Sequence, residues 1–281
     1  MIANSFEYSK PASLAEALTQ LADGSAKPLA GGMSLIPMMK LRLASPEKLV
    51  DLSGVPGLDG IAESAGTVRI GAMATHHALE GSAVLRGKCP LLAETASNIG
   101  DVQVRNTGTL GGAAAHADPS ADYPAALLAL EAKFLVASSK GTRTVDVKDL
   151  FVDALSTSLE PGELIQEIQV PVDDSKVGTC YRKVFQPASG YATVGIAVRV
   201  RQDGAKITFA RVGVTGLASK AFRAAAVEDA LLAGKSVADA AALVNNGVDA
   251  NSDIHASAEY RKHLAKVTTE RAINAALARI A

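Results

Sequence analysis

Residues 29–36 read Leu-Ala-Gly-Gly-Met-Ser-Leu-Ile, and residues 107–115 read Thr-Gly-Thr-Leu-Gly-Gly-Ala-Ala-Ala. Each stretch places paired glycines after a predicted strand and just before a predicted helix start. Glycine allows positive φ angles and lets the backbone approach a ligand closely. Successive free N–H groups at such a turn, with a helix N-terminus behind them, bind anions. The two loops therefore predict a diphosphate site, to which the hydroxyl groups of Ser34, Thr107 and Thr109 would add donors.

The residues alone leave a second interpretation open, in which each loop is an ordinary tight turn. Short glycine motifs have low specificity. The chain contains no G-x-G-x-x-G, because no two of its glycines are separated by a single residue, and it contains no G-x-x-x-x-G-K-[ST]. These sequence features argue against a Rossmann dinucleotide site and against a P-loop. A nucleotide site in this chain would be of another design.

The segments around the two loops predict alternating strands and helices. A capping box, Ser13-Leu14-Ala15-Glu16, opens a helix that runs to Leu21, and residues 64–66 form the turn of a hairpin. Strands are predicted at residues 27–30, 49–52, 67–70, 133–137, 142–147 and 163–170. Further helices are predicted at residues 34–43, 75–85, 91–99 and 124–130. The first unit thus has a β-α-β pattern.

The pattern changes near residue 173. Strands are predicted at residues 178–185, 192–201 and 206–215, followed by helices at residues 224–232, 236–244 and 256–280. In the last helix, two spaced triplets predict the apolar face: Tyr260, Leu264 and Val267, then Ile273, Leu277 and Ile280. We therefore expect an α+β fold with two domains, residues 1–173 (subdomains about 1–55 and 56–173) and residues 174–281.

Composition excludes several classes of protein. The chain has 281 residues, a formal net charge of -1 and a 48% hydrophobic content, which is typical of a globular protein and argues against binding nucleic acid. Its two cysteines, Cys89 and Cys180, are too few for an iron–sulfur cluster and indicate a reducing, cytoplasmic location. The N-terminus does not resemble a secretory signal, and no apolar run predicts a transmembrane segment.

Several ordered motifs resemble one family. They are Ala30 to Arg42 (AGGMSLIPMMKLR), Gln103 to Gly112 (QVRNTGTLGG), Leu159 to Ile165 (LEPGELI), Ser189 to Ala192 (SGYA) and Ser257 to Arg261 (SAEYR). Over nearly its whole length the chain is similar to the FAD-binding medium subunit of molybdenum hydroxylases, especially the aerobic carbon monoxide dehydrogenase type, with xanthine dehydrogenase as a more distant relative. The benzoyl-CoA reductase branch differs by an iron–sulfur insertion that this chain lacks.

The resemblance implies a vanillyl-alcohol-oxidase (PCMH) type of FAD-binding fold. It has two α/β subdomains around the cofactor and a C-terminal α+β domain with a three-stranded antiparallel sheet and helices. FAD would bind non-covalently, with its diphosphate held by residues 29–36 and 109–113. Met33 and Ala113 depart from the polar residues that the family often has at these positions. The implied cofactor-binding residues are Leu29, Ala30, Gly31, Gly32, Met33, Ser34, Leu35, Ile36, Thr107, Thr109, Leu110, Gly111, Gly112, Ala113, Asp122, Lys183 and Tyr191.

Three of these residues have individual roles in the resemblance. Asp122 would hydrogen-bond the flavin, Lys183 would approach it, and Tyr191 would cover one face of the isoalloxazine ring. No residue is assigned a catalytic or metal-binding role. His76, His77 and His116 are the histidines near the expected site, and their spacing supports neither a metal site nor covalent attachment of FAD.

The resemblance also implies a function and partners. The chain would carry electrons from [2Fe-2S] clusters on a small subunit, through FAD, to NAD, a quinone or oxygen. The molybdenum cofactor would lie on a large subunit, in a dimer of heterotrimers. Two alternatives remain: a self-contained FAD-dependent oxidase or reductase of the same fold, and a non-catalytic interaction subunit with structural glycine loops.

Overall fold

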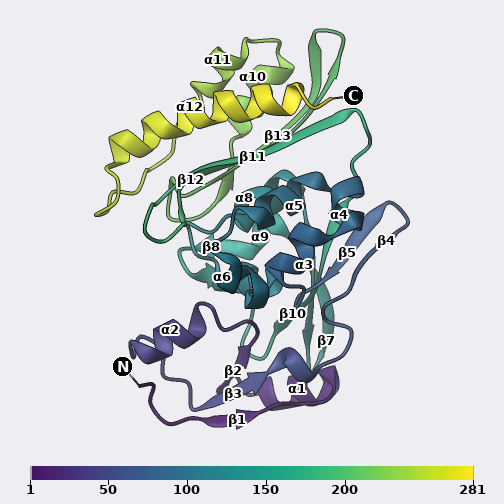
Figure 1. Ribbon diagram of the computed structural model, residues 1–281, viewed down its shortest axis with the longest axis vertical. Coiled ribbons are helices and arrows are strands. Elements are labelled where there is room, and N and C mark those ends of the chain that lie inside the picture. The colour runs from purple at the N-terminus through teal and green to yellow at the C-terminus, as the bar shows by residue number, and fades with distance from the viewer. Residues whose placement is uncertain (1, 281) are drawn as a thin grey trace.

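The computed structural model describes residues 2–280 and is built from three stacked regions (Figure 1). The first, at the bottom of Figure 1, is a parallel sheet of order β1-β3-β2 with short helices beside it. Its elements are β1 (Glu7–Ser9), α1 (Leu14–Leu21), β2 (Ala26–Leu29), α2 (Leu35–Lys40), β3 (Lys48–Asp51) and the 3₁₀ helix η1 (Leu52–Gly54). Parallel neighbours need crossover connections, and α1 and α2 supply them here.

The β-α-β prediction for this region is confirmed, with strand β1 in addition. Ser13 caps α1 by accepting from the Glu16 N–H, and the Glu16 carboxylate accepts in turn from the Ala12 N–H, which is close to the predicted capping box. Helix α2 is shorter than the predicted 34–43. It stops because the chain turns after Lys40, with Arg42 at φ 59°.

The second region is an antiparallel sheet of order β4-β5-β10-β6-β7, covered by helices. The strands are β4 (Ile61–Ser64), β5 (Thr67–Gly71), β6 (Lys133–Ser138), β7 (Gly141–Asp146) and β10 (Leu164–Pro171), with a small hairpin of β8 (Phe151–Asp153) and β9 (Ser156–Thr157). The helices are α3 (His76–Gly81), α4 (Ala83–Lys88), α5 (Pro90–Ser97), α6 (Val102–Thr107), α7 (Leu110–His116), α8 (Tyr123–Ala129) and α9 (Val147–Leu150).

Two predictions for this region were wrong. The helix predicted over 75–85 is two helices, because Ser82 ends α3 and caps α4 by accepting from the Leu85 N–H. The glycine-rich second loop was predicted to follow a strand, but helix α6 precedes it and residues 110–116 are themselves helical. The hairpin at residues 64–66 is confirmed, since Ser64 pairs with Thr67.

The third region, at the top of Figure 1, is an antiparallel sheet of order β11-β12-β13-β14 with helices on its outer face. Its elements are β11 (Val177–Phe185), β12 (Ala192–Asp203), β13 (Lys206–Thr215), β14 (Phe222–Arg223), α10 (Ala225–Leu232), α11 (Val237–Ala241) and α12 (Ala258–Leu277). The three predicted strands are present, and β14 adds a short fourth. Helix α8 of the second region packs on β12 and β13, which joins the two regions.

The predicted apolar face of the last helix is confirmed in part: Ile273 is buried, and Leu264, Leu277 and Ile280 are partly buried against the core, but the fully buried stripe runs beside them. Tyr260 is exposed, whereas Arg261, Ala265, Thr268, Thr269, Ala272, Ile273 and Ala276 are buried. Arg261 is 1% exposed and donates to the carbonyl oxygens of Thr193 (2.6 Å) and Gly216 (2.7 Å). Small residues let the helix lie close to the sheet, so its buried stripe is not its most hydrophobic one.

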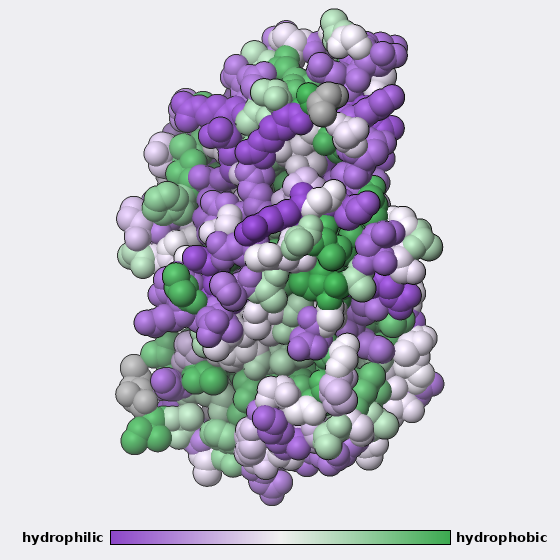
Figure 2. All heavy atoms as spheres, turned by 45° about the vertical axis from the view of Figure 1, so that its right-hand side comes forward, coloured by the Kyte–Doolittle hydropathy of each residue, from purple (hydrophilic) through white to green (hydrophobic). Residues whose placement is uncertain are grey.

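The predicted α+β fold class is confirmed, and the domain boundary at residue 173 stays a prediction. Hydrophilic side chains cover much of the upper part of the face in Figure 2, and hydrophobic residues reach the surface in separate groups below it. Over residues 2–280, no helix is both long and apolar enough to cross a membrane.

Candidate functional site

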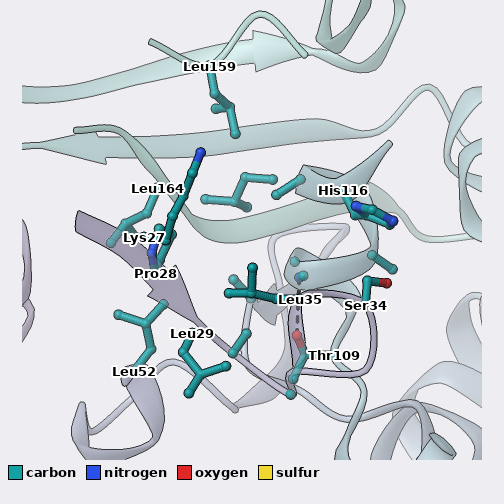
Figure 3. Close-up of a pocket in the computed structure, with 18 of the residues that line it drawn as sticks. Lys27, Pro28, Leu29, Ser34, Leu35, Leu52, Thr109, His116, Leu159 and Leu164 are labelled. Atoms are coloured by element: carbon teal, nitrogen blue, oxygen red, sulfur yellow. Dashed lines mark hydrogen bonds between the residues drawn. The ribbon is translucent and has the colours of Figure 1, made fainter. Parts of the chain in front are cut away.

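A cleft of about 610 Å³ opens between the first and second regions, which is a typical size for a cofactor pocket (Figure 3). The first glycine loop and β2 form one wall, and α7 lies against it. The segment from Leu155 to Ile165 forms the opposite wall, so that Leu159 faces Lys27 across the cleft in Figure 3.

The first loop offers a row of free backbone donors to this cleft. Among the described residues, no acceptor pairs with the N–H groups of Gly31, Gly32, Met33, Ser34 or Leu35. The next N–H, of Ile36, donates to the Gly32 carbonyl at 3.0 Å and begins the α2 hydrogen bonds. Gly32 has φ +70°, which turns the chain sharply. Since unpaired backbone donors need partners, this row is suited to an anion with several oxygens.

The backbone N–H groups of the second loop are already hydrogen-bonded within the protein. The Leu110 N–H donates to the Ala74 carbonyl (3.0 Å), the Gly111 N–H to the Ala72 carbonyl (2.9 Å) and the Gly112 N–H to Thr109 Oγ1 (3.1 Å). The Ala113 N–H donates to the Thr109 carbonyl at 3.0 Å. The prediction of free N–H groups in this loop was therefore wrong. Thr109 caps α7, and the chain between β5 and α3 supplies the other acceptors.

The two loops nevertheless touch. A Cβ atom on Gly31 would overlap the Thr107 carbonyl oxygen and would lie 2.8 Å from Gly108 Cα. On the other side, a Cβ on Gly111 would lie 2.5 Å from the Ala72 Cβ. The glycines of both loops therefore allow close packing of backbone, and the residues of the first loop that carry unpaired amides line the cleft.

Asp122 and Lys183 lie outside the lining of this cleft, in a buried ion pair. Lys183 Nζ is 2.9 Å from Asp122 Oδ1 and donates to the Gly190 carbonyl at 2.7 Å. The Tyr181 hydroxyl donates to the same carboxylate. Burial raises the pKa of Asp122 despite the opposing charge of Lys183. This geometry supplies a structural role for both residues, and their contact with a cofactor stays a prediction.

Tyr191 lies close to Ser34 of the first loop and outside the lining of the cleft. The residue is 39% exposed, so part of it is accessible at the surface. Burial of the other part raises the pKa of Tyr191, and a hydrogen bond with the Ser34 side chain opposes that rise. The hydroxyl of the predicted flavin-covering residue is thus close to the loop that offers the free amides.

Of the predicted residues, eleven line the cleft: Leu29, Ala30, Gly31, Gly32, Met33, Ser34, Leu35, Thr109, Gly111, Gly112 and Ala113. Ile36, Thr107, Leu110, Asp122, Lys183 and Tyr191 are not part of its lining. The departures Met33 and Ala113 both lie in the lining, where the donors are backbone atoms.

Among the lining residues to which sequence reasoning gave no binding role are Lys27, the wall from Leu155 to Ile165, and His76, which it placed only near the site. Lys27 is the one lysine or arginine among the lining residues, and its side chain extends into the cleft in Figure 3. The wall contains Glu160-Pro161-Gly162-Glu163, a turn signal that marks an exposed loop but not its neighbours. Glu163 is paired with Arg143 at 2.7 Å, so Lys27 faces a partly neutralised wall.

Side chains of the types that bind metals do not form a cluster in the described part of the chain. Across residues 2–280, there is no group of three or more His, Cys, Asp or Glu side chains that could hold a metal ion. Cys89 and Cys180 are both buried and unpaired.

Known proteins match both halves of the chain. A family model described as "FAD binding domain in molybdopterin dehydrogenase" matches residues 4–173. A model described as "CO dehydrogenase flavoprotein C-terminal domain" matches residues 179–276. The carbon monoxide dehydrogenase medium chain of Hydrogenophaga pseudoflava is 40% identical, over 100% of this chain and 100% of its own length.

Two further relatives agree with these matches. The glyceraldehyde dehydrogenase medium chain of Sulfolobus acidocaldarius is 37% identical over 95% of this chain and 96% of its own length. A solved structure of carbon monoxide dehydrogenase from Hydrogenophaga pseudoflava, which lacks the Mo-pyranopterin moiety of its molybdenum cofactor, superimposes with a TM-score of 0.96 at 40% identity, with 100% of both chains covered.

Proposed function

Since the chain belongs to the family of FAD-binding medium subunits of carbon monoxide dehydrogenase-type molybdenum hydroxylases, we propose that it binds FAD non-covalently and carries electrons within such a complex. It is an oxidoreductase subunit. Electrons would enter from [2Fe-2S] clusters of a partner and leave to NAD, a quinone or oxygen. One observation carries the proposal: residues 31–35, whose N–H groups are unpaired, line a cleft of cofactor size in a chain of this family.

The residues of the cleft fit a dinucleotide. Free amides in a row supply donors for diphosphate oxygens, and Lys27 adds one positive charge near them. Apolar side chains such as Leu29, Leu52 and Leu164 line the remaining surface. Bound FAD supplies a centre that exchanges one or two electrons, and the protein supplies its position and surroundings. We propose the seventeen residues expected from the sequence as the cofactor-binding set, with residues 31–35 as its centre.

The partners are proposed from the chemistry that this chain leaves to others. An iron–sulfur cluster takes four cysteine ligands, and this chain has two buried cysteines. The [2Fe-2S] clusters would therefore belong to a small subunit and the molybdenum cofactor to a large one, in a dimer of heterotrimers. Unpaired cysteines also support a cytoplasmic location. The relatives' names differ in substrate, carbon monoxide in one and glyceraldehyde in another, so this chain does not define the substrate.

Flavin release tests the proposal directly. The full chain is purified and denatured with acid, and the released flavin is identified by chromatography and measured against protein. We expect FAD, released without proteolysis, at close to one per chain. Failure to bind any flavin, with retained binding to partner subunits, would support an interaction subunit. Substrate oxidation by the isolated chain would support a self-contained oxidase. Either result would overturn the proposal.

A further inference from the structure

His76 is a buried side chain that borders the cleft. It is the first residue of α3, its relative exposure is 4%, and it is among the residues that line the cleft. Its backbone N–H donates to the Gly108 carbonyl at 2.9 Å, which fixes α3 against the second glycine loop. The neighbouring His77, in contrast, is exposed and borders no part of the cleft.

The protonation of the His76 ring follows from its partner. Nδ1 lies 3.1 Å from the hydroxyl of Tyr123, which is fully buried and has no other hydrogen-bond partner among the described side chains. If Tyr123 accepted this bond, its own proton would be buried without an acceptor, which costs free energy. Tyr123 therefore donates to Nδ1. Burial lowers the pKa of His76 to about 4, so the ring is neutral at pH 7 and carries its proton on Nε2.

Among the described residues, no atom accepts a hydrogen bond from the Nε2–H group. Nε2 is not one of the fully buried side-chain atoms that lack a partner, so it keeps some accessible surface. A Cβ atom on Gly108 would lie only 2.6 Å from Nε2, so glycine at 108 leaves room for the ring. Gly108 Cα in turn lies 2.8 Å from the position of a Cβ on Gly31. Nε2 therefore lies beside Gly108, the residue that packs against Gly31, and His76 and Gly31 line the same cleft.

We propose that His76 is a further cofactor-binding residue, whose Nε2–H donates a hydrogen bond to a diphosphate oxygen of FAD. The inference rests on the proposed function, because it needs a dinucleotide in the cleft. Tyr123 acts as a positioning residue, because its hydroxyl holds the ring in the tautomer that donates from Nε2. Gly108 provides the space in which the ring lies.

Binding of three ligands to the full apo-chain tests the inference. FAD, ADP and riboflavin are titrated into wild type, His76→Leu, His76→Gln and the control His77→Leu. ADP contains the diphosphate without the flavin, and riboflavin contains the flavin without phosphate. We expect His76→Leu to weaken FAD and ADP about 10-fold each, the loss typical of one hydrogen bond to a charged group, and to leave riboflavin unchanged. His77→Leu should bind all three ligands like wild type.

The two hypotheses fail in different ways. Wild-type chain that binds neither FAD nor ADP would overturn the proposed function. Wild-type binding that His76→Leu leaves unaltered, or a loss for FAD and riboflavin without one for ADP, would overturn the role of His76. Thermal unfolding shows whether each variant is folded, and His76→Gln carries the test if His76→Leu is not. In nitrogen-edited NMR of wild type, ADP should shift the Nε2 resonance of His76 and leave that of His77 unchanged.

Discussion

Lys183 Nζ lies 2.9 Å from Oδ1 and 3.0 Å from Oδ2 of Asp122, and both side chains are almost completely buried. The pair links β11 of the third region to the start of α8 in the second. Removing one partner of such a pair leaves an uncompensated charge in the interior. The link is therefore expected to hold the two regions together, whether or not it also meets a cofactor.

Lys183→Met should destabilise the protein by about 3–5 kcal/mol, because the Asp122 carboxylate then stays buried without its counter-charge. Urea unfolding at pH 7 measures the change. The double variant Lys183→Met, Asp122→Asn should recover part of the loss, since the amide is neutral and can still accept from Tyr181. A Lys183→Met variant with wild-type stability that no longer binds FAD would contradict the structural role.

Gly31→Ala should abolish tight FAD binding, because the new Cβ would overlap the Thr107 carbonyl and force the two loops apart. Overpacking of this kind also costs about 1–3 kcal/mol of stability. The control is Gly60→Ala, where no heavy atom lies within 4 Å of the added Cβ. Fluorescence titration with FAD measures both variants. Equal affinity of Gly31→Ala and Gly60→Ala would contradict the importance of the loop contact.

Lys27→Glu should weaken FAD binding by about 5- to 10-fold at low salt, because a negative charge then faces the diphosphate in the cleft. The difference from wild type should shrink at 0.5 M salt, since a partly exposed charge is screened. Lys140→Glu makes the same change of charge away from the cleft lining and should keep wild-type affinity. A salt-independent effect of Lys27→Glu would argue against an electrostatic role.

Tyr191→Ala should expose the bound flavin, while Tyr191→Phe should protect it like wild type, because stacking needs the ring and not the hydroxyl. Iodide quenching of flavin fluorescence gives the accessibility of the ring. Indistinguishable quenching in the alanine variant and in wild type would show that Tyr191 does not cover the flavin.

His76 should make stability depend on pH. Its folded pKa of about 4 lies below the ordinary value of 6.5. Between these values the unfolded chain binds a proton that the folded chain does not, so the contribution is complete above pH 6.5 and is lost as the pH falls towards 4. The loss reaches about 2 kcal/mol at pH 5. Urea unfolding at pH 7 and 5 should show a smaller fall in His76→Leu than in wild type, and no such reduction in His77→Leu.

Local signals in the sequence predicted the elements that depend on local chemistry. The Ser13 capping box, the hairpin at residues 64–66 and the long strands of the third region all depend on residues near one another in the chain. In the last helix, the prediction was wrong for Tyr260, which is exposed, whereas Leu264 and Ile273 do pack on the core. The buried stripe is set by close approach to the sheet, as where Gly178 packs against the Ala276 carbonyl.

The candidate site, like the fold, was predictable from the sequence only in part. Paired glycines at 31 and 32 indicated a backbone donor row, and the structure has one. Paired glycines at 111 and 112 gave the same signal, but their N–H groups meet acceptors on Ala72 and Thr109. Ala72 is far away in the sequence, so only the fold could show that this second row is already used. The sequence placed His76 near the site but could not show that its Nε2–H is a donor, because the tautomer depends on the hydrogen bond with Tyr123.

The unpaired amides of residues 31–35 also give the chain a reporter of its own occupancy. Without a ligand, these N–H groups are held by no protein acceptor and should exchange with deuterium quickly. The Leu110–Ala113 amides, already hydrogen-bonded, should exchange slowly in either state. Mass spectrometry of the two peptides would therefore show whether the subunit already contains its cofactor when it joins its partners during maturation of the complex.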